Sequence, residues 1–208
     1  MSKAKPQADG RDPKSTRKVI KPATQHLGEV RLIGGQWKRS KLPVANRPGL
    51  RPTPDRVRET LFNWLGQDLT GWRCADVFAG TGVLGFEAAS RGAAEVWLVE
   101  QDPALVEQLN STQAKLQAAA VRIQRADAIT VLRQLGAARM DLVFIDPPFD
   151  STLLDAALQG AAAALKPGGS IYLEAPIAWT SAQLAPYRLR ALRHLKAGAV
   201  HAHLLKII

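Results

Sequence analysis

Cysteine and long apolar runs are both scarce in this sequence, and each absence narrows the class of protein. Cys74 is the single cysteine among 208 residues, so an intrachain disulfide is impossible and a structural zinc site is not expected. No apolar run approaches the ~20 residues that span a bilayer, and residues 1–14 form no apolar signal segment. We therefore expect a cytoplasmic protein that binds neither metal nor membrane, with a monomer as the default.

Acidic residues are scarce at the start of the chain, and this locates its positive charge. The formal net charge is +10. Residues 1–60 hold 15 Lys and Arg against 5 Asp and Glu, whereas residues 61–208 hold 13 of each kind. A basic arm on a neutral domain indicates a polyanionic partner such as a nucleic acid. For residues 1–25 alone, a solvated tail that only keeps the protein soluble is an open alternative.

The chain is expected to divide into three segments. Residues 1–27 are rich in Lys, Pro, Gln and Ala and predict a disordered basic tail. Residues 28–50 predict a basic, RNA-binding hairpin extension, with strands over residues 29–33 and 37–42 around a Gly-Gly turn. Residues 51–208 form the remaining, enzymatic domain.

The pattern of residues 51–208 predicts an α/β fold. Thr53 and Pro54 predict the N-cap and first residue of a helix that ends near Leu65. Short apolar runs then alternate with helical patterns, which predicts a mostly parallel sheet with helices on both faces and an antiparallel hairpin at its end. The expected strands are 74–78, 95–99, 121–124, 142–145, 170–173, 187–195 and 199–207, and the later helices are 83–91, 103–117, 128–135 and 153–164.

A glycine-rich loop follows the first strand of this alternation. Gly80, Gly82 and Gly85 match G-x-G-x-x-G, and Glu100 ends the next strand 20 residues after the first glycine. This is the dinucleotide fingerprint in a βαβ context, where the acid accepts hydrogen bonds from ribose hydroxyls. A nicotinamide-dependent oxidoreductase is therefore one possibility, and tight strand–helix packing without a ligand is another.

Asp76, at the start of the same loop, favours a different cofactor. A carboxylate beside a dinucleotide pyrophosphate would be repelled, by about 4 kcal/mol for each charge pair at ~4 Å and an effective dielectric near 20. S-adenosylmethionine instead carries an ammonium and a sulfonium, which a carboxylate attracts. The pattern Asp-x-Phe-x-Gly-x-Gly therefore favours S-adenosylmethionine. It assigns cofactor contacts to Asp76, Phe78, Gly80, Thr81 and Gly82 as well as Glu100.

Two further acidic residues follow strands. Asp127, with Ala128 after it, could accept the adenine amino group of the cofactor, while the backbone reaches a ring nitrogen. Asp127 could equally cap the next helix. Asp102, followed by Pro103, is better interpreted as a helix N-cap with proline at the first helical position.

A second motif, Asp146-Pro147-Pro148-Phe149, ends the fourth strand of the alternation. Ligands of open α/β sheets bind at the carboxyl ends of strands. The prolines fix the backbone, so a carboxylate and a stiff carbonyl can hold one planar exocyclic amine. An aromatic ring can stack on a flipped base. We predict that Asp146, Pro147 and Phe149 are the catalytic residues; a proline-rich turn capped by Asp146 is the structural alternative.

These motifs resemble the bacterial ribosomal RNA small-subunit methyltransferase D family. The resemblance covers roughly residues 29–208 and includes RLIGGQWK at 31–38 and LRPTPDRVRETLFNWL at 50–65. Two departures are mild: Thr81 stands where the family often has serine, and Arg39-Ser40 stands where it has a second Gly-Arg. The resemblance implies a seven-stranded class I (Rossmann-like) methyltransferase fold with S-adenosylmethionine as cofactor.

The same resemblance implies the substrate. The target would be N2 of a guanine, conventionally numbered 966, in 16S rRNA of an assembling 30S particle. Pocket and RNA contacts would come from the N-terminal motifs: Arg31, Trp37, Lys38, Arg39, Lys41, Arg51, Thr53 and Arg56. An adenine-N6 nucleic-acid methyltransferase, which also acts on an exocyclic amine, is one alternative. A non-catalytic RNA-binding assembly factor with a vestigial cofactor site is the other.

Overall fold

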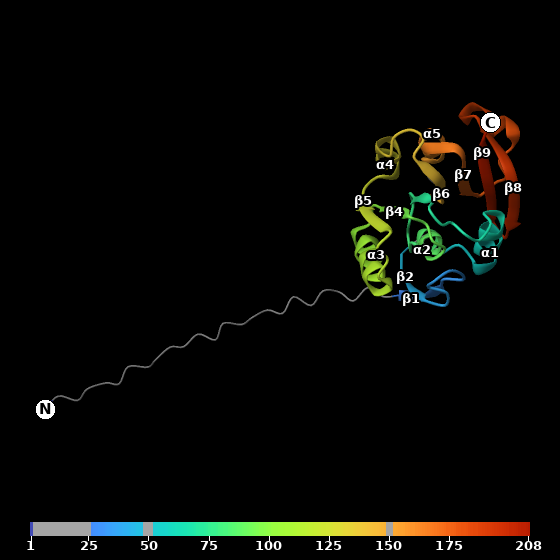
Figure 1. Cartoon of the computed structure of the whole chain (residues 1–208). Helices are drawn as coiled ribbons and strands as arrows, with labels where there is room; N and C mark the ends of the chain where they lie inside the picture. The colour runs from blue at the N-terminus through green and yellow to red at the C-terminus, as the bar shows by residue number, and fades with distance from the viewer. Residues whose placement is uncertain (2–25, 48–51, 149–151) are drawn as a thin grey trace.

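The computed structural model describes residues 1, 26–47, 52–148 and 152–208 (Figure 1). In these ranges the chain forms a large sheet of seven strands and a small sheet of two. The predicted tail therefore lies almost wholly outside the described residues, as do Arg51 and Phe149. No helix of the described ranges is long and apolar enough to cross a membrane.

The large sheet has the strand order β5-β4-β3-β6-β7-β9-β8. Neighbours from β5 to β7 run parallel, whereas β9 runs antiparallel to both β7 and β8. The predicted α/β class, the mostly parallel sheet and the C-terminal antiparallel hairpin are thus confirmed. The strands are β3 (Arg73–Asp76), β4 (Glu95–Glu100), β5 (Val121–Arg125), β6 (Met140–Ile145), β7 (Leu165–Ala175), β8 (Leu189–Ala197) and β9 (Val200–Ile207).

Helices cover both faces of this sheet, as the alternation predicted. Buried side chains of α1, α2 and α3 join the core on one face, and those of α4, α5 and α6 join the core on the other. The helices are α1 (Asp55–Trp64), α2 (Val83–Ser90), α3 (Pro103–Leu116), α4 (Ala128–Gln134), α5 (Leu154–Ala164) and α6 (Ser181–Leu184), followed by a 3-10 turn, η1 (Ala185–Tyr187).

The N-terminal hairpin forms, but its second strand is displaced from the prediction. β1 (His26–Arg31) pairs antiparallel with β2 (Lys41–Ala45), so Val30 lies opposite Leu42. Trp37 was expected at the start of the second strand; it lies instead in the turn before it and packs against the core. The reason is that Trp37 N–H donates to Ser90 Oγ, which draws the turn onto α2.

Two other local predictions were wrong. Thr53 does not cap α1: the helix begins at Asp55 after Pro54 and has no side-chain cap, because the Thr53 hydroxyl donates to Glu174 instead. Tyr187 was expected to open a strand, but it ends η1, and its hydroxyl donates to Asp155 on α5. The short helix α6 was not predicted.

The order of strands also marks where a ligand can bind. The chain builds β3, β4 and β5 outward in one direction and then returns to place β6 on the other side of β3. At such a reversal the connections leave in opposite directions and open a crevice beyond the carboxyl ends of the two central strands. Here those ends carry Asp76, on β3, and Asp146, just after β6.

Candidate active site

Three carboxyl groups meet at the carboxyl edge of the central strands. Asp76 is the last residue of β3, Asp146 follows β6, and Glu174 is next to last in β7. Ile145 pairs with Leu173, so Asp146 and Glu174 stand level on neighbouring strands. Asp76 and Glu174 are buried, with 2% and 3% of their surface exposed, while Asp146 is partly exposed.

The glycine loop between β3 and α2 has the backbone that its sequence requires. Gly80 and Gly82 have φ angles of +52° and +75°, a region that residues with a Cβ rarely adopt. Gly85 is needed for packing, because a Cβ there would lie 2.1 Å from Leu98 Cδ2. Gly85 N–H also donates to Asp76 Oδ2 (3.1 Å), which ties the carboxylate to the start of the helix.

Glu100 closes this loop from the neighbouring strand. Its Oε2 accepts from Gly80 N–H (2.9 Å), and its Oε1 accepts from the N–H groups of Gln101 and Asp102. The structure thus brings together Asp76, Gly80 and Glu100, as predicted. Glu100 stands at the carboxyl end of β4 and is partly exposed, the position from which an acid reaches ribose hydroxyls.

The other residues predicted for the cofactor lie around the same edge. Phe78 is half-buried in the loop, and Thr81 is buried, with its Oγ1 accepting from Val83 N–H (3.4 Å). Asp127 caps α4, since its Oδ1 accepts from Thr130 N–H (2.8 Å), and Ala128 is the buried first residue of that helix. The capping interpretation of Asp127 is therefore confirmed; contact with adenine stays a prediction.

The electrostatics of the site favour a cationic ligand over an anionic one. Burial raises the pKa of Asp76 to about 7, although hydrogen bonds from the backbone oppose the shift, and Glu100 and Glu174 raise it further. Burial, then the charges of Glu174 and Asp76, raise the pKa of Asp146 well above its ordinary value. A ligand that brings positive charge would lower these pKa values. The residues therefore fit a cofactor with an ammonium and a sulfonium, and not a pyrophosphate.

Glu174 was missed by the sequence reasoning. Its Oε1 accepts from Thr53 Oγ1 (2.8 Å) and from Tyr172 OH (2.7 Å). Thr53 was predicted to line the pocket, and it reaches the site edge through this buried bond. The only signal in the sequence was an acid ending an apolar strand, which also describes Glu100.

The residues predicted to contact RNA are mostly exposed. Arg31, Lys38, Arg39 and Arg56 are exposed on the hairpin and α1. Lys41 is exposed too but forms an ion pair with Glu29 (2.6 Å). Trp37 instead packs against the core, so it supports the turn.

A buried ion-pair network attaches the hairpin to the domain, and the sequence did not reveal it. Glu87 on α2 accepts from Ile33 N–H (2.9 Å) and contacts Arg58 of α1 (3.4 Å) and Arg91 (2.8 Å). Arg58 also donates to the carbonyls of Arg31 and Thr53. One buried guanidinium thus links the hairpin, the segment before α1 and the glycine-loop helix.

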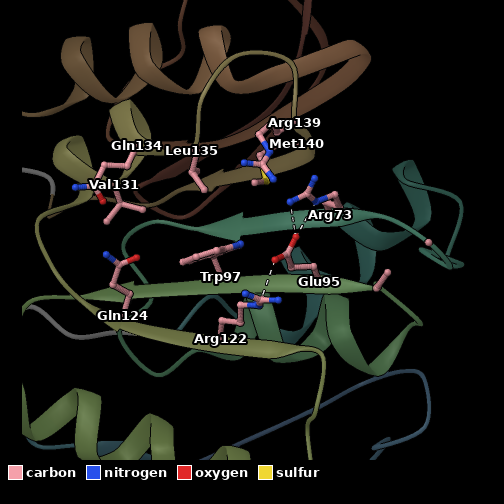
Figure 2. Close-up of a pocket in the computed structure, with 12 residues that line it drawn as sticks. Arg73, Glu95, Trp97, Arg122, Gln124, Val131, Gln134, Leu135, Arg139 and Met140 are labelled. Atoms are coloured by element: carbon pink, nitrogen blue, oxygen red, sulfur yellow. Dashed lines mark hydrogen bonds and ion pairs between the residues drawn. The ribbon is translucent and has the colours of Figure 1, made fainter.

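A hollow of about 900 Å³ lies away from this site. Figure 2 shows that Glu95 in it points between Arg73 and Arg122, to which it is bonded at 2.6 and 3.2 Å. Arg73 and Glu95 begin their strands, so the hollow opens at the amino ends of β3 and β4. No predicted site residue lines it. Within the described ranges, no group of three or more His, Cys, Asp or Glu could hold a metal ion.

Comparisons with known proteins agree with this geometry. The family model described as "Conserved hypothetical protein 95" matches residues 30–206. The ribosomal RNA small subunit methyltransferase D of Escherichia coli is 49% identical over 135 residues, 65% of this chain and 68% of that protein. The protein of the same name from Haemophilus influenzae is 43% identical over 152 residues, 71% and 79% of the two chains.

Solved structures show the same fold. The structure of yhhF from Escherichia coli superposes with a TM-score of 0.74 at 42% identity, covering 86% of this chain and 97% of that one. A structure from Haemophilus influenzae gives a TM-score of 0.72 at 34% identity, covering 86% and 98%. With the glycine loop, the carboxyl edge and the N-terminal motifs in place, the chain belongs to the ribosomal RNA small subunit methyltransferase D family.

Proposed function

We propose that this protein transfers a methyl group from S-adenosylmethionine to the exocyclic N2 amine of one guanine in 16S rRNA, within an assembling 30S particle. The observation that carries the proposal is Asp146, which follows β6 at the reversal of strand order, beside the glycine loop and Asp76. The names of the relatives support ribosomal RNA as the substrate. Guanine N2 and position 966 rest on the family resemblance.

The cofactor would lie along the glycine loop. Asp76 would face its positive charges and Glu100 its ribose, while Phe78, Gly80, Thr81 and Gly82 line the loop and Asp127 and Ala128 lie toward the adenine. When bound, S-adenosylmethionine supplies an electrophilic methyl group. In this arrangement the methyl group would lie near Asp146, which follows β6, the strand paired with β3.

The chain's own contribution to the chemistry is mainly positioning. Asp146 and the carbonyl beside the buried Pro147 would accept hydrogen bonds from the amine, which turns its lone pair toward the methyl carbon. These two acceptors would hold the amine toward the methyl group that the cofactor supplies, and the nitrogen would release its proton to solvent after the transfer, so that no strong general base is needed. Phe149, outside the described residues, would stack on the base.

We also propose roles for the three segments. Residues 28–50 would bind RNA through the exposed Arg31, Lys38, Arg39 and Lys41, with Arg51 and Arg56 beyond, and Trp37 would hold the turn in place. Residues 51–208 would form the methyltransferase domain, and residues 1–27 a basic tail. We further propose that the protein acts as a monomer in the cytoplasm, where 30S particles assemble.

Transfer of labelled methyl to 30S particles that lack the modification tests the function. We expect one labelled guanine, identified as N2-methylguanine after digestion of the rRNA. Label on adenine would indicate the N6 alternative, and cofactor-free RNA binding would indicate the assembly factor; either result would refute the proposal.

Asp146→Ala tests the role of the carboxylate. The variant should bind S-adenosylmethionine with near-normal affinity in calorimetry but lose most of its turnover, at least about a hundredfold. Asp155→Ala, an exposed acid on α5, is the matched control and should leave both values unchanged. Normal turnover by Asp146→Ala would show that the assigned role is wrong.

A further inference from the structure

Glu174 occupies a place at the site that the proposed methyl transfer does not use. It stands level with Asp146 on the neighbouring strand. It also lies on the face of the sheet toward Tyr172 and α1, where the segment before α1 reaches it through Thr53. A base whose amine is held by Asp146 would therefore have its adjoining edge beside Glu174.

The Glu174 side chain is held in one orientation. The hydroxyls of Thr53 and Tyr172 both donate to Oε1, from two different segments of the chain. Burial raises the pKa of Glu174, and these two hydroxyl donors oppose that shift because they favour the ionised form of the carboxyl group. Both bonds end on Oε1, so neither of them occupies Oε2.

The buried carboxylate of Glu174 also needs further hydrogen-bond donors. The charged groups that act on the neighbouring Asp146 are Glu174 and Asp76, which are themselves acidic. An ionised carboxylate buried beside other acids is costly unless donors surround it. Two hydroxyls supply part of that compensation, and a ligand with an N–H group facing Oε2 would add to it.

Among the bases with an exocyclic amine, guanine alone fits this requirement. Its N2 amine adjoins N1–H, a donor. The N6 amine of adenine adjoins the N1 acceptor, and the N4 amine of cytosine adjoins the N3 acceptor. A carboxylate beside Asp146 would attract the N1–H donor of guanine and repel the ring acceptors of adenine and cytosine. Enzymes read flipped bases by hydrogen bonds along this Watson–Crick edge.

We propose that Glu174 selects guanine: its carboxylate accepts the N1–H of the flipped base while Asp146 holds the adjacent N2 amine. The inference rests on the proposed function. Thr53 and Tyr172 act through Glu174 as positioning residues. The site then rejects a wrong base because a buried carboxylate would face a ring acceptor with no proton between them.

A base analogue separates the two roles. 2,6-Diaminopurine keeps the N2 amine but carries an acceptor at N1. We would compare 30S particles reconstituted with guanine or 2,6-diaminopurine at the target position, using labelled S-adenosylmethionine and single-turnover rates. The wild-type protein should methylate guanine at least about a hundredfold faster than the analogue.

Glu174→Gln is the decisive variant, because its amide can donate to the analogue's N1. The single-turnover rate of guanine methylation should fall by tenfold or more. The ratio of the guanine rate to the 2,6-diaminopurine rate should fall by at least about tenfold. Tyr172→Phe, which removes one orienting hydroxyl, should shift the preference less, in the same direction. Glu107→Gln, on the exposed face of α3, should leave the preference unchanged.

The possible failures are distinguishable. If the wild-type protein leaves guanine N2 unmethylated, the proposed function is wrong. If it methylates guanine, and Glu174→Gln binds cofactor normally yet keeps the wild-type preference, the role of Glu174 is wrong. If Glu174→Gln does not fold, an unchanged preference in Tyr172→Phe would overturn the inference.

Discussion

Glu87 of α2 and Arg58 of α1 form an ion pair in which both side chains are completely buried, with 3.4 Å between Oε2 and Nη1. Glu87 also accepts the N–H of Ile33, so the same carboxylate holds the N-terminal hairpin. One buried pair of charges therefore joins both the N-terminal hairpin and α1 to α2.

Removing one member of that pair should be severe. Glu87→Ala removes the buried carboxylate partner of Arg58 and, among the described residues, leaves only the exposed Asp55 paired with it. Loss of a partner from a buried pair costs about 3–5 kcal/mol. Urea unfolding would measure the loss. Glu29→Gln, which breaks the exposed pair with Lys41, is the control and should leave the unfolding midpoint unchanged. Equal midpoints for Glu87→Ala and the wild-type protein would show that the network does not hold the fold together.

Asp76 should lower the stability of the folded protein at neutral pH, although it strengthens cofactor binding. Its pKa in the folded protein is about 7, against 3.8 ordinarily. The folded state thus holds a proton that the unfolded state has lost, and stability falls as pH rises from about 4 to about 7. Asp76→Asn removes this cost, so it should be more stable than wild type above pH ~7, by at most about 4 kcal/mol, and equal to it below pH ~4.

The same variant should bind S-adenosylmethionine at least about tenfold more weakly, because the positive charges lose their partner. Wild-type affinity should rise with pH up to about 7, with proton release on binding, as calorimetry in two buffers would show. If Asp76→Asn is more stable but binds S-adenosylmethionine with unchanged affinity, Asp76 does not contact the cofactor.

Gly85 should tolerate no side chain. In Gly85→Ala the new Cβ would meet Leu98 Cδ2 at 2.1 Å and Asp76 Cβ at 3.3 Å, so either the buried Leu98 side chain or α2 must shift. Overpacking of this kind costs about 1–3 kcal/mol, and the shift of Asp76 should also weaken cofactor binding. Gly28→Ala, with no atom within 4 Å of its new Cβ, is the matched control. Thermal unfolding and calorimetry on both variants check the prediction.

The exposed cations of the hairpin turn should bind phosphates. Lys38→Glu combined with Arg39→Glu should weaken RNA binding and lower the slope of log K against log salt by about two. Cofactor affinity should not change. Arg133→Glu, exposed on α4 on the other face of the sheet, is the control. A salt slope equal to that of wild type would place the RNA elsewhere.

Much of the fold could be predicted because its signals are local. Alternating apolar runs placed the strands, and Asp102 with Pro103 marked the start of α3, where the side chain accepts from Ala104 N–H as expected. The roles of Gly80 and Gly82 could be predicted from the glycine spacing of the loop alone. Such features depend on residues a few positions apart, so a pattern can reveal them.

The rest depends on contacts between distant segments. Thr53 has the sequence of an N-cap, yet its hydroxyl bonds Glu174, 121 residues away, and nothing near Thr53 foretells it. Trp37 has the composition of a strand residue, yet a bond to Ser90 places it in a turn. Arg58 has the appearance of a surface residue of α1 and is completely buried. Tertiary packing overrode local preference at each of these positions.

The thiol of Cys74 can report how often the centre of the sheet opens. It lies in β3, between Val96 of β4 and Leu142 of β6, fully buried, and burial raises the pKa of its thiol well above the ordinary value. A thiol reagent can therefore react only when the centre of the sheet opens. The labelling rate of the unaltered protein should report the free energy of that opening, and ligands bound at the strand ends should slow it.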